Sequence, residues 1–150
     1  MEKNTLIVLC GLPASGKSTL AKKLESMGVV RVNPDLIRKE LYGDESYQGN
    51  GRQVFEIAHQ RTINCGRVGD NCVFDAMSIT KKSRAKLIKI GKEHFDYVVC
   101  IVLDTIPAVC IERNENRERQ VPYQVMLQKV INFVAPTKEE GFDEIFYIHN

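Results

Sequence analysis

A short stretch near the start of the chain carries residues whose types and spacing suit the binding of phosphate. Residues 11–18 read GLPASGKS, which fits the pattern GxxxxGK followed by Ser or Thr. In this pattern the backbone N–H groups of the loop and of the next helix point at phosphate oxygens, and the helix dipole adds to them. The residues expected to hold a nucleoside triphosphate are Gly11, Pro13, Ala14, Ser15, Gly16, Lys17, Ser18 and Thr19.

Two side chains of this loop, and one acid further along, point to chemistry beyond binding. Lys17 has the length to reach the β- and γ-phosphates, so we predict a catalytic role for it as well as a binding one. The Ser18 hydroxyl is a hard oxygen ligand that suits Mg²⁺. Asp75 follows an apolar run, where an acid often holds Mg²⁺ beside such a loop; the alternative is a turn or cap aspartate. We therefore predict ATP and Mg²⁺ as cofactors, with Ser18 and Asp75 as metal ligands.

A second pair of candidate residues opens a predicted helix. Residues 33–35 read NPD, which is typical of an N-cap, a proline in the first helical position and an acid in the first turn. Arg38 lies three residues after Asp35, so both share one helix face. A carboxylate there can accept the proton of an attacking hydroxyl, and a guanidinium can clamp a substrate phosphate. The spacing fits equally well a helix-start acid with a surface ion pair.

Arginines extend the inner face of another predicted helix, at residues 106–117. Its apolar stripe of Ile106, Val109 and Cys110 continues at helical spacing into Arg113 and Arg117. A helix of this kind could close over the triphosphate as a lid, with Arg113 binding the nucleotide and Arg117 neutralising charge in the transition state. The alternative is a solvated helix whose arginines pair with its own glutamates.

The elements that must position these residues alternate along the chain. Short apolar runs predict five strands, at residues 6–10, 29–32, 72–74, 98–103 and 145–148. Helical spacing appears between them, at residues 17–27, 34–42, 52–65, 81–95, 106–117 and 122–133. This pattern predicts an α/β fold of the P-loop kinase type, a three-layer sandwich around a five-stranded, mostly parallel sheet with a small helical lid. Ligands of such sheets bind beyond the carboxyl ends of the strands, so Asp35, Asp75 and the glycine loop should converge there. Asp104 also lies at this edge, where a helix cap is the favoured role.

Composition limits the class of protein. With 150 residues, 43% hydrophobic and 27% charged, residues 1–150 are expected to form a single folded domain. The net charge of +2 gives little long-range attraction to nucleic acid. Five cysteines without CxxC spacing are expected to be reduced core residues of a cytoplasmic protein, and no segment predicts a membrane anchor or a signal peptide. The basic side chains of residues 81–92, Arg84 among them, are expected to form a solvated helix face.

The order of these motifs resembles the P-loop kinase domain of polynucleotide 5′-kinases, both the phage type and the animal repair enzyme. The likeness rests on residues 11–19, NPDLIR at 33–38, VFD at 73–75, ERNENR at 112–117 with the following VP at 121–122, Pro136, and EEGFDEI at 139–145. This resemblance implies that Asp35 takes the proton of a 5′-hydroxyl, that Arg38 holds the neighbouring phosphate of the strand, and that Arg117 contacts the transferring phosphate. One departure is the Ala76 and Met77 that follow Asp75, where family members often carry Thr or Asn.

Three functions are compatible with these residues. The leading hypothesis is a kinase that moves the γ-phosphate of ATP to a 5′-hydroxyl end of RNA or DNA. The alternative keeps this chemistry with a small acceptor such as a nucleoside, a sugar acid or an antibiotic. A nucleotide-dependent switch without transfer is the third, and a lid of arginines disfavours it.

Overall fold

The fold is built on one sheet of five parallel strands. The structure is a computed structural model, which describes residues 3–149. The sheet order is β2-β3-β1-β4-β5, and every neighbouring pair is parallel, so the expected sheet is confirmed. The apolar runs form the strands β1 (Thr5–Cys10), β2 (Val30–Val32), β3 (Cys72–Phe74), β4 (Tyr97–Leu103) and β5 (Glu144–Ile148).

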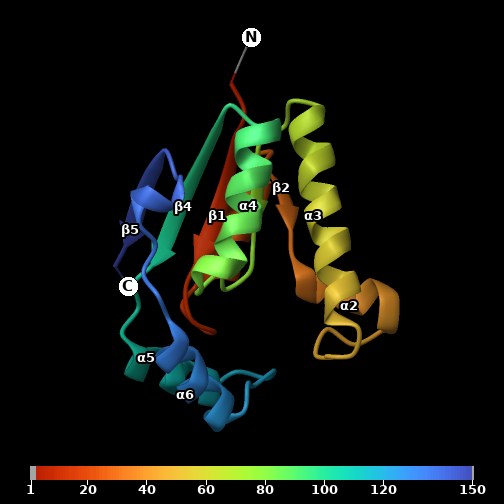
Figure 1. Cartoon of the computed structure of the whole chain (residues 1–150). Coiled ribbons are helices and arrows are strands. Elements are labelled where there is room, and N and C mark those ends of the chain that lie inside the picture. The colour runs from red at the N-terminus through yellow and green to blue at the C-terminus, as the bar shows by residue number, and fades with distance from the viewer. Residues whose placement is uncertain (1–2, 150) are drawn as a thin grey trace.

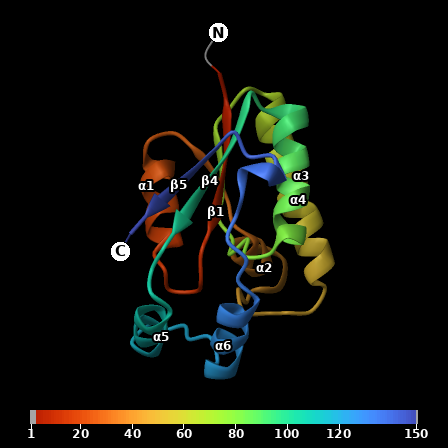
Figure 2. The same cartoon turned by 60° about the vertical axis from the view of Figure 1, so that its left-hand side comes forward.

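Helices cover both faces of this sheet. α1 (Lys17–Ser26) lies on one side, and α3 (Gly51–Arg67) and α4 (Lys81–His94) lie together on the other (Figure 2). α2 (Pro34–Tyr42) packs against α3 on that second side. The predicted three layers, helices on both faces of one sheet, are therefore confirmed. No helix within residues 3–149 is long and apolar enough to cross a membrane.

The core has one apolar cluster for each layer contact. The larger cluster joins β1, β3 and β4 to α3 and α4, with Phe74 and Leu87 among its fully buried side chains. A smaller cluster around Leu9 and Ala21 joins the sheet to α1. Strands that are apolar on both faces need helices on both sides of the sheet, since an uncovered apolar face would be exposed to water. All five cysteines are buried free thiols, as expected.

A pair of helices lies beyond the carboxyl ends of the strands, as predicted for a lid. α5 (Pro107–Glu115) and α6 (Tyr123–Asn132) sit below the sheet in Figure 1, at the end to which β1 and β4 point. A third cluster of Leu12, Cys110 and Met126 attaches this lid to the glycine loop. A 3₁₀ helix, η1 (Lys138–Glu140), then leads the chain back to β5.

The inner face of the lid helix differs from the predicted stripe. Ile106 precedes the helix and is 65% exposed, while Cys110 and Asn114 are the buried residues of α5. Pro107 begins the helix one residue later than expected, because proline suits the first helical position. The helix ends at Glu115, so the prediction that Arg117 belongs to it is wrong.

Arg84 is buried, so its predicted place on a solvated face is also wrong. Its guanidinium donates to the carbonyls of Ser78 (2.9 Å) and Val134 (2.8 Å) and pairs with Glu140 (2.9 Å). The lysines of α4 are exposed as predicted. Arg84 differs because it falls on the same helix face as the buried Leu87 and Ile88, at spacings of three and four residues.

Candidate active site

The glycine loop between β1 and α1 has the backbone geometry of a phosphate cradle. Gly16 caps α1 with a φ of 103°, and Ala14 also has a positive φ of 64°. A Cβ at Gly11 would lie 2.6 Å from the Ser15 hydroxyl oxygen, so a larger residue there would displace the Ser15 side chain. The first N–H groups of α1 have no partner within the helix, which leaves them and the dipole available to an anion.

Lys17 lies inside this cradle rather than in solvent. It is buried, and its ammonium donates to the carbonyl oxygen of Leu12 over 2.7 Å. Burial lowers its pKa to about 8, although nearby Asp75 works in the opposite direction. A buried cation without an ion-pair partner in the part of the chain that the structure describes is well placed to bind an anion, because the anion would supply the missing charge.

Asp75 follows β3 at the same edge and is surrounded by donors. Its Oδ2 accepts from Arg31 Nη2 (2.8 Å) and Nε (3.0 Å), from Asn33 Nδ2 (2.9 Å) and from the Ser18 hydroxyl (3.4 Å). Sequence reasoning missed Arg31. Its signal was a charged residue between two valines of a short strand, where a side chain beside the sheet needs a buried partner.

Ser18 and Asp75 have the oxygen donors that Mg²⁺ prefers. Their side chains meet at 3.4 Å beside the first turn of α1. Mg²⁺ is usually held by one or two protein oxygens together with substrate phosphates and water, so this pair fits the ion in the presence of a nucleotide. Residues 3–149 contain no cluster of three or more His, Cys, Asp or Glu side chains that would hold a metal by themselves.

Asp35 stands at the start of α2, on the other side of the cleft. The Asn33 side chain caps this helix by accepting from the N–H groups of Asp35 (2.8 Å) and Leu36 (3.2 Å), so the predicted cap is confirmed. Arg38 Nη1 donates to Asp35 Oδ1 over 2.6 Å. The Arg38 guanidinium also lies 5.8 Å from the centre of the Phe55 ring, and its buried Nε has no hydrogen-bond partner within residues 3–149. Packing therefore holds Arg38 behind Asp35.

The loop between α5 and α6 carries Arg117. Its Nε donates to Asn114 Oδ1 over 3.1 Å, and its pKa is lowered by burial and by the neighbouring charge of Arg119. Arg113 is exposed on α5. The structure thus brings Arg117, but not the buried face of α5, toward the loop that was predicted to bind phosphate.

Arg119 is a second residue that sequence reasoning missed as a site residue. Its Nη1 lies 3.4 Å from Asp35 Oδ2, and its Nε donates to the Ser46 hydroxyl over 2.9 Å and lies 3.6 Å from Glu45 Oε1. Its guanidinium crosses from the lid to the loop that joins α2 to α3, rather than pairing with a glutamate of its own segment.

Several of these groups line one cleft of about 260 Å³. A residue predicted to bind the nucleotide and a residue predicted to accept a proton therefore lie in the same cleft. Of the residues predicted for the site, Ser18, Asp35 and Arg117 border it, whereas Lys17, Arg38 and Asp75 do not. The lining side chains belong to Ser18, Lys22, Arg31, Asn33, Asp35, Leu36, Glu45, Arg117 and Arg119.

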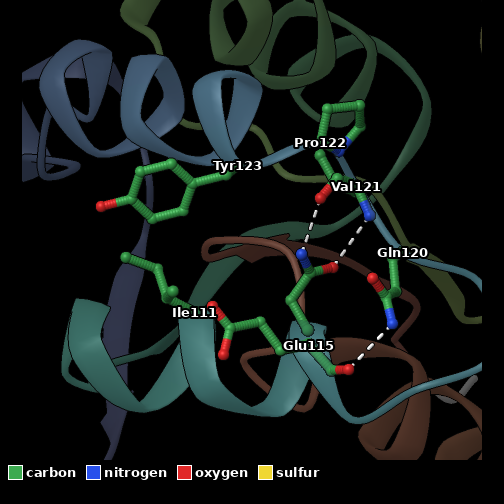
Figure 3. Close-up of a pocket in the computed structure, with 7 residues that line it drawn as sticks. Ile111, Glu115, Gln120, Val121, Pro122 and Tyr123 are labelled. Atoms are coloured by element: carbon green, nitrogen blue, oxygen red, sulfur yellow. Dashed lines mark hydrogen bonds between the residues drawn. The ribbon is translucent and has the colours of Figure 1, made fainter.

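A second hollow of about 300 Å³ lies within the lid, between α5 and α6. Figure 3 shows Ile111 of α5 facing Tyr123 at the start of α6, with Gln120 bonded to the carbonyl of Glu115 (2.8 Å). Glu115 is the one charged residue of its lining, so no cation there can hold a phosphate. The cleft beside Ser18, rather than this hollow, is the candidate active site.

Asp104 does not have its favoured role of helix cap. The residue at the N-cap of α5 is Ile106, which makes no side-chain capping bond. The Asp104 carboxylate instead lies 3.1 Å from His149 Nδ1. The backbone N–H of Asp104 donates to the carbonyl of Ile148, which extends the hydrogen bonding between β4 and β5 by one residue. Two more residues separate Asp104 from the helix, which is too far for capping.

Comparison with known proteins gives a family match. A family model described as an AAA domain matches residues 6–135, which is most of the chain. A bifunctional polynucleotide phosphatase/kinase of Schizosaccharomyces pombe is 26% identical over 150 residues. That alignment covers 96% of this chain and 33% of the relative, so the chain spans about a third of the relative's length.

Two solved structures share the fold. A chain of the Pnkp1/Rnl/Hen1 RNA repair complex superposes with a TM-score of 0.78 at 20% identity, over 88% of this chain and 44% of that one. A gluconokinase from Sinorhizobium meliloti 1021 superposes with a TM-score of 0.69 at 17% identity, over 99% and 84%. At these identities the likeness concerns the architecture, which both proteins share with this chain.

Proposed function

Since this chain belongs to the AAA domain family, we propose that it is a kinase that transfers the γ-phosphate of ATP to a 5′-hydroxyl end of RNA or DNA. The observation that carries the proposal is the shared cleft. The Ser18 hydroxyl lies at the end of the cleft next to the glycine loop, and the Asp35 carboxylate lies on the opposite side. Arg117 enters the same cleft from the loop between α5 and α6. The relative from Schizosaccharomyces pombe, a polynucleotide phosphatase/kinase, supports this choice of acceptor.

The proposed reaction follows from this placement. The acceptor oxygen attacks the γ-phosphorus while Asp35 takes the hydroxyl proton, the bond between the γ-phosphorus and the bridging oxygen breaks, and ADP leaves. Lys17 and the N–H groups at the start of α1 hold the phosphates. Arg117 neutralises charge on the transferring group, which is where a cation contributes most to the rate. Mg²⁺, held by Ser18 and Asp75, would supply further charge neutralisation on the phosphate oxygens.

The positive charges of the cleft favour an anionic acceptor. Arg31 is neutralised by its ion pair with Asp75. Lys22, Arg117 and Arg119 remain against the acids Asp35 and Glu45, so the lining keeps an excess of positive charge. A strand of nucleic acid brings a phosphate next to its terminal hydroxyl and can use this excess charge, whereas a neutral alcohol cannot.

Transfer of label from [γ-³²P]ATP to 5′-hydroxyl oligonucleotides is the decisive test. We expect Asp35→Asn to reduce kcat about 10²- to 10⁴-fold, the usual contribution of a general base, while ATP affinity stays nearly unchanged. Asp70→Asn is the matched control, because Asp70 is an exposed acid in the turn before β3, at the other end of the sheet. Full activity of Asp35→Asn, or no transfer by the wild-type protein, would refute the proposal.

Salt dependence separates a polynucleotide from a small acceptor. A strand held through several phosphates loses affinity steeply as salt rises, because bound counterions are released on association. A small acceptor without phosphates, such as a nucleoside, would show little dependence. We further propose a cytoplasmic location, since five buried free thiols suit a reducing compartment.

A further inference from the structure

Arg119 connects two parts of the cleft that lie far apart in the sequence. It belongs to the loop between α5 and α6, and the groups it contacts lie at the start of α2 and in the loop after it. Its Nε donates to Ser46, and its Nη1 and Nη2 approach Asp35 Oδ2 (3.4 Å) and the carbonyl of Glu45 (3.5 Å). These contacts join the loop between α5 and α6 to the start of α2 and to the loop that follows α2.

The two arginines on Asp35 are held very differently. Arg38 makes the short bond of 2.6 Å to Oδ1, is almost fully buried, and does not line the cleft. Arg119 makes the long contact of 3.4 Å to Oδ2, and its side chain is 38% exposed. Oδ2 is therefore the oxygen that an acceptor hydroxyl can reach, and Arg119 is the partner that gives way when it does.

An arginine displaced from Asp35 by the acceptor can turn to another anion beside the reacting hydroxyl. Glu45 is the other acid at hand, but its carboxylate lies at 3.6 Å and is partly solvated. A planar guanidinium is well suited to a phosphate, which it can hold through two parallel hydrogen bonds. The anion that follows a 5′-hydroxyl in a nucleic acid strand is the phosphate of the same nucleotide.

We propose that Arg119 binds the acceptor through the phosphate next to its hydroxyl, so that one loop addresses both substrates. Arg117 serves the transferring phosphate, and Arg119, two residues later, selects acceptors that carry an anion beside the hydroxyl. This inference rests on the proposed kinase function and assigns a specificity residue to it. When the acceptor binds, Arg119 would therefore leave Asp35 and contact the phosphate of the acceptor instead.

Steady-state kinetics with a 5′-hydroxyl oligonucleotide and ATP test this assignment. We expect Arg119→Ala to raise the KM for the oligonucleotide about 10- to 100-fold, the loss typical of a hydrogen bond between charged partners, with the KM for ATP unchanged. The slope of log KM against log salt should fall by about 0.7, the value of one phosphate contact on a single strand. Arg119→Lys should recover part of the loss, because lysine holds phosphate only as a point charge.

Two other variants complete the experiment. Arg117→Ala should reduce kcat with little change in the KM for the oligonucleotide, which is the opposite split. Arg52→Ala is the matched control, since Arg52 pairs with Glu56 on the exposed face of α3 and should leave every parameter unchanged. Thermal melts of all variants check that the fold is kept.

The outcomes separate this inference from the function on which it rests. Wild-type transfer combined with an unchanged oligonucleotide KM or salt slope in Arg119→Ala overturns the role of Arg119 alone. An equal rise in the KM for ATP would also overturn it, because Arg119 would then hold the lid as a whole. Absence of transfer by the wild-type protein to any oligonucleotide removes the proposed function and this inference with it.

Discussion

At the scale of single residues, the cleft depends on charges placed where water is scarce. Lys17 is buried beside a carbonyl oxygen, and Asp75 is buried among Arg31, Asn33 and Ser18. A buried cation with no carboxylate in direct contact destabilises the ligand-free protein and favours ligands that carry negative charge. Below a pH of about 8 protonated Lys17 opposes folding, and this penalty is relieved as the pH rises from there toward the pKa of a free lysine.

The pKa of Lys17 leads to a prediction about ATP binding. Because burial lowers this pKa to about 8, free Lys17 loses its proton above that pH, whereas phosphates would hold the proton in the complex. ATP affinity should then fall about tenfold per pH unit above pH 8, as linkage requires. Calorimetric titrations from pH 7.5 to 9.5 measure it. Lys17→Met should bind weakly with no such trend, and a constant wild-type affinity over this range would contradict the prediction.

At the scale of elements, the lid loop after α5 is held by one buried amide. Asn114, which is 4% exposed, donates to the carbonyl of Val121 (2.7 Å) and accepts from its N–H (2.9 Å). The same Oδ1 accepts from Arg117 Nε. Figure 3 draws the Val121 backbone bonds beside the lid hollow. One side chain thus closes residues 114–121 into a loop and orients the arginine within it.

Replacement of this amide should disturb catalysis through Arg117. Asn114→Leu would leave two polar backbone groups of Val121 unpaired, at a cost of about 1–3 kcal/mol each if they stay buried. We expect kcat to fall about tenfold or more, and the fall to be much smaller in an Arg117→Ala background, because the two residues act as one unit. Asn116→Leu is the control, since Asn116 is exposed and its side chain, among the described residues, bonds only the carbonyl of Glu112. Equal effects of both substitutions would contradict this view.

At the scale of the whole molecule, Arg84 ties the return of the chain to the sheet. After α6 the chain passes Val134, forms η1 and enters β5, and the guanidinium of Arg84 bonds both Val134 and Glu140 on this path. Although burial opposes it, bonds from Arg84 and from the Thr137 N–H hold the pKa of Glu140 below its usual value. The pair therefore stabilises the fold at neutral pH, and this contribution is lost as the pH falls through the lowered pKa.

Breaking this ion pair should destabilise the fold strongly. Removing one partner of a buried pair costs about 3–5 kcal/mol, because the other charge stays behind. We expect Arg84→Met to lose an amount of that order in urea unfolding, and Arg84→Met with Glu140→Leu to lose less than the sum of the single variants. Lys86→Met, on the exposed face of the same helix, is the control. A loss for Arg84→Met no larger than that for Lys86→Met would contradict the prediction.

Patterns within a few residues were enough to predict the frame of this protein. Residues 11–18, the cap at Asn33 and the apolar runs of the strands predicted the phosphate loop, the start of α2 and the parallel sheet, because turns, caps and periodicity are local properties. The carboxyl ends of parallel strands meet at one edge, so the approach of Asp75 to Ser18 also followed from the order of elements.

The partners of the charged residues were decided only by the tertiary structure. Arg31 with Asp75, Arg119 with Asp35 and Arg84 with Glu140 are pairs separated by 44, 84 and 56 positions. No periodicity connects such positions, and a charge in a helical segment looks solvated until the packing of distant elements buries it. The end of α5 at Glu115, which puts Arg117 and Arg119 in a loop, was likewise decided by the tertiary structure, in which Asn114 contacts Val121.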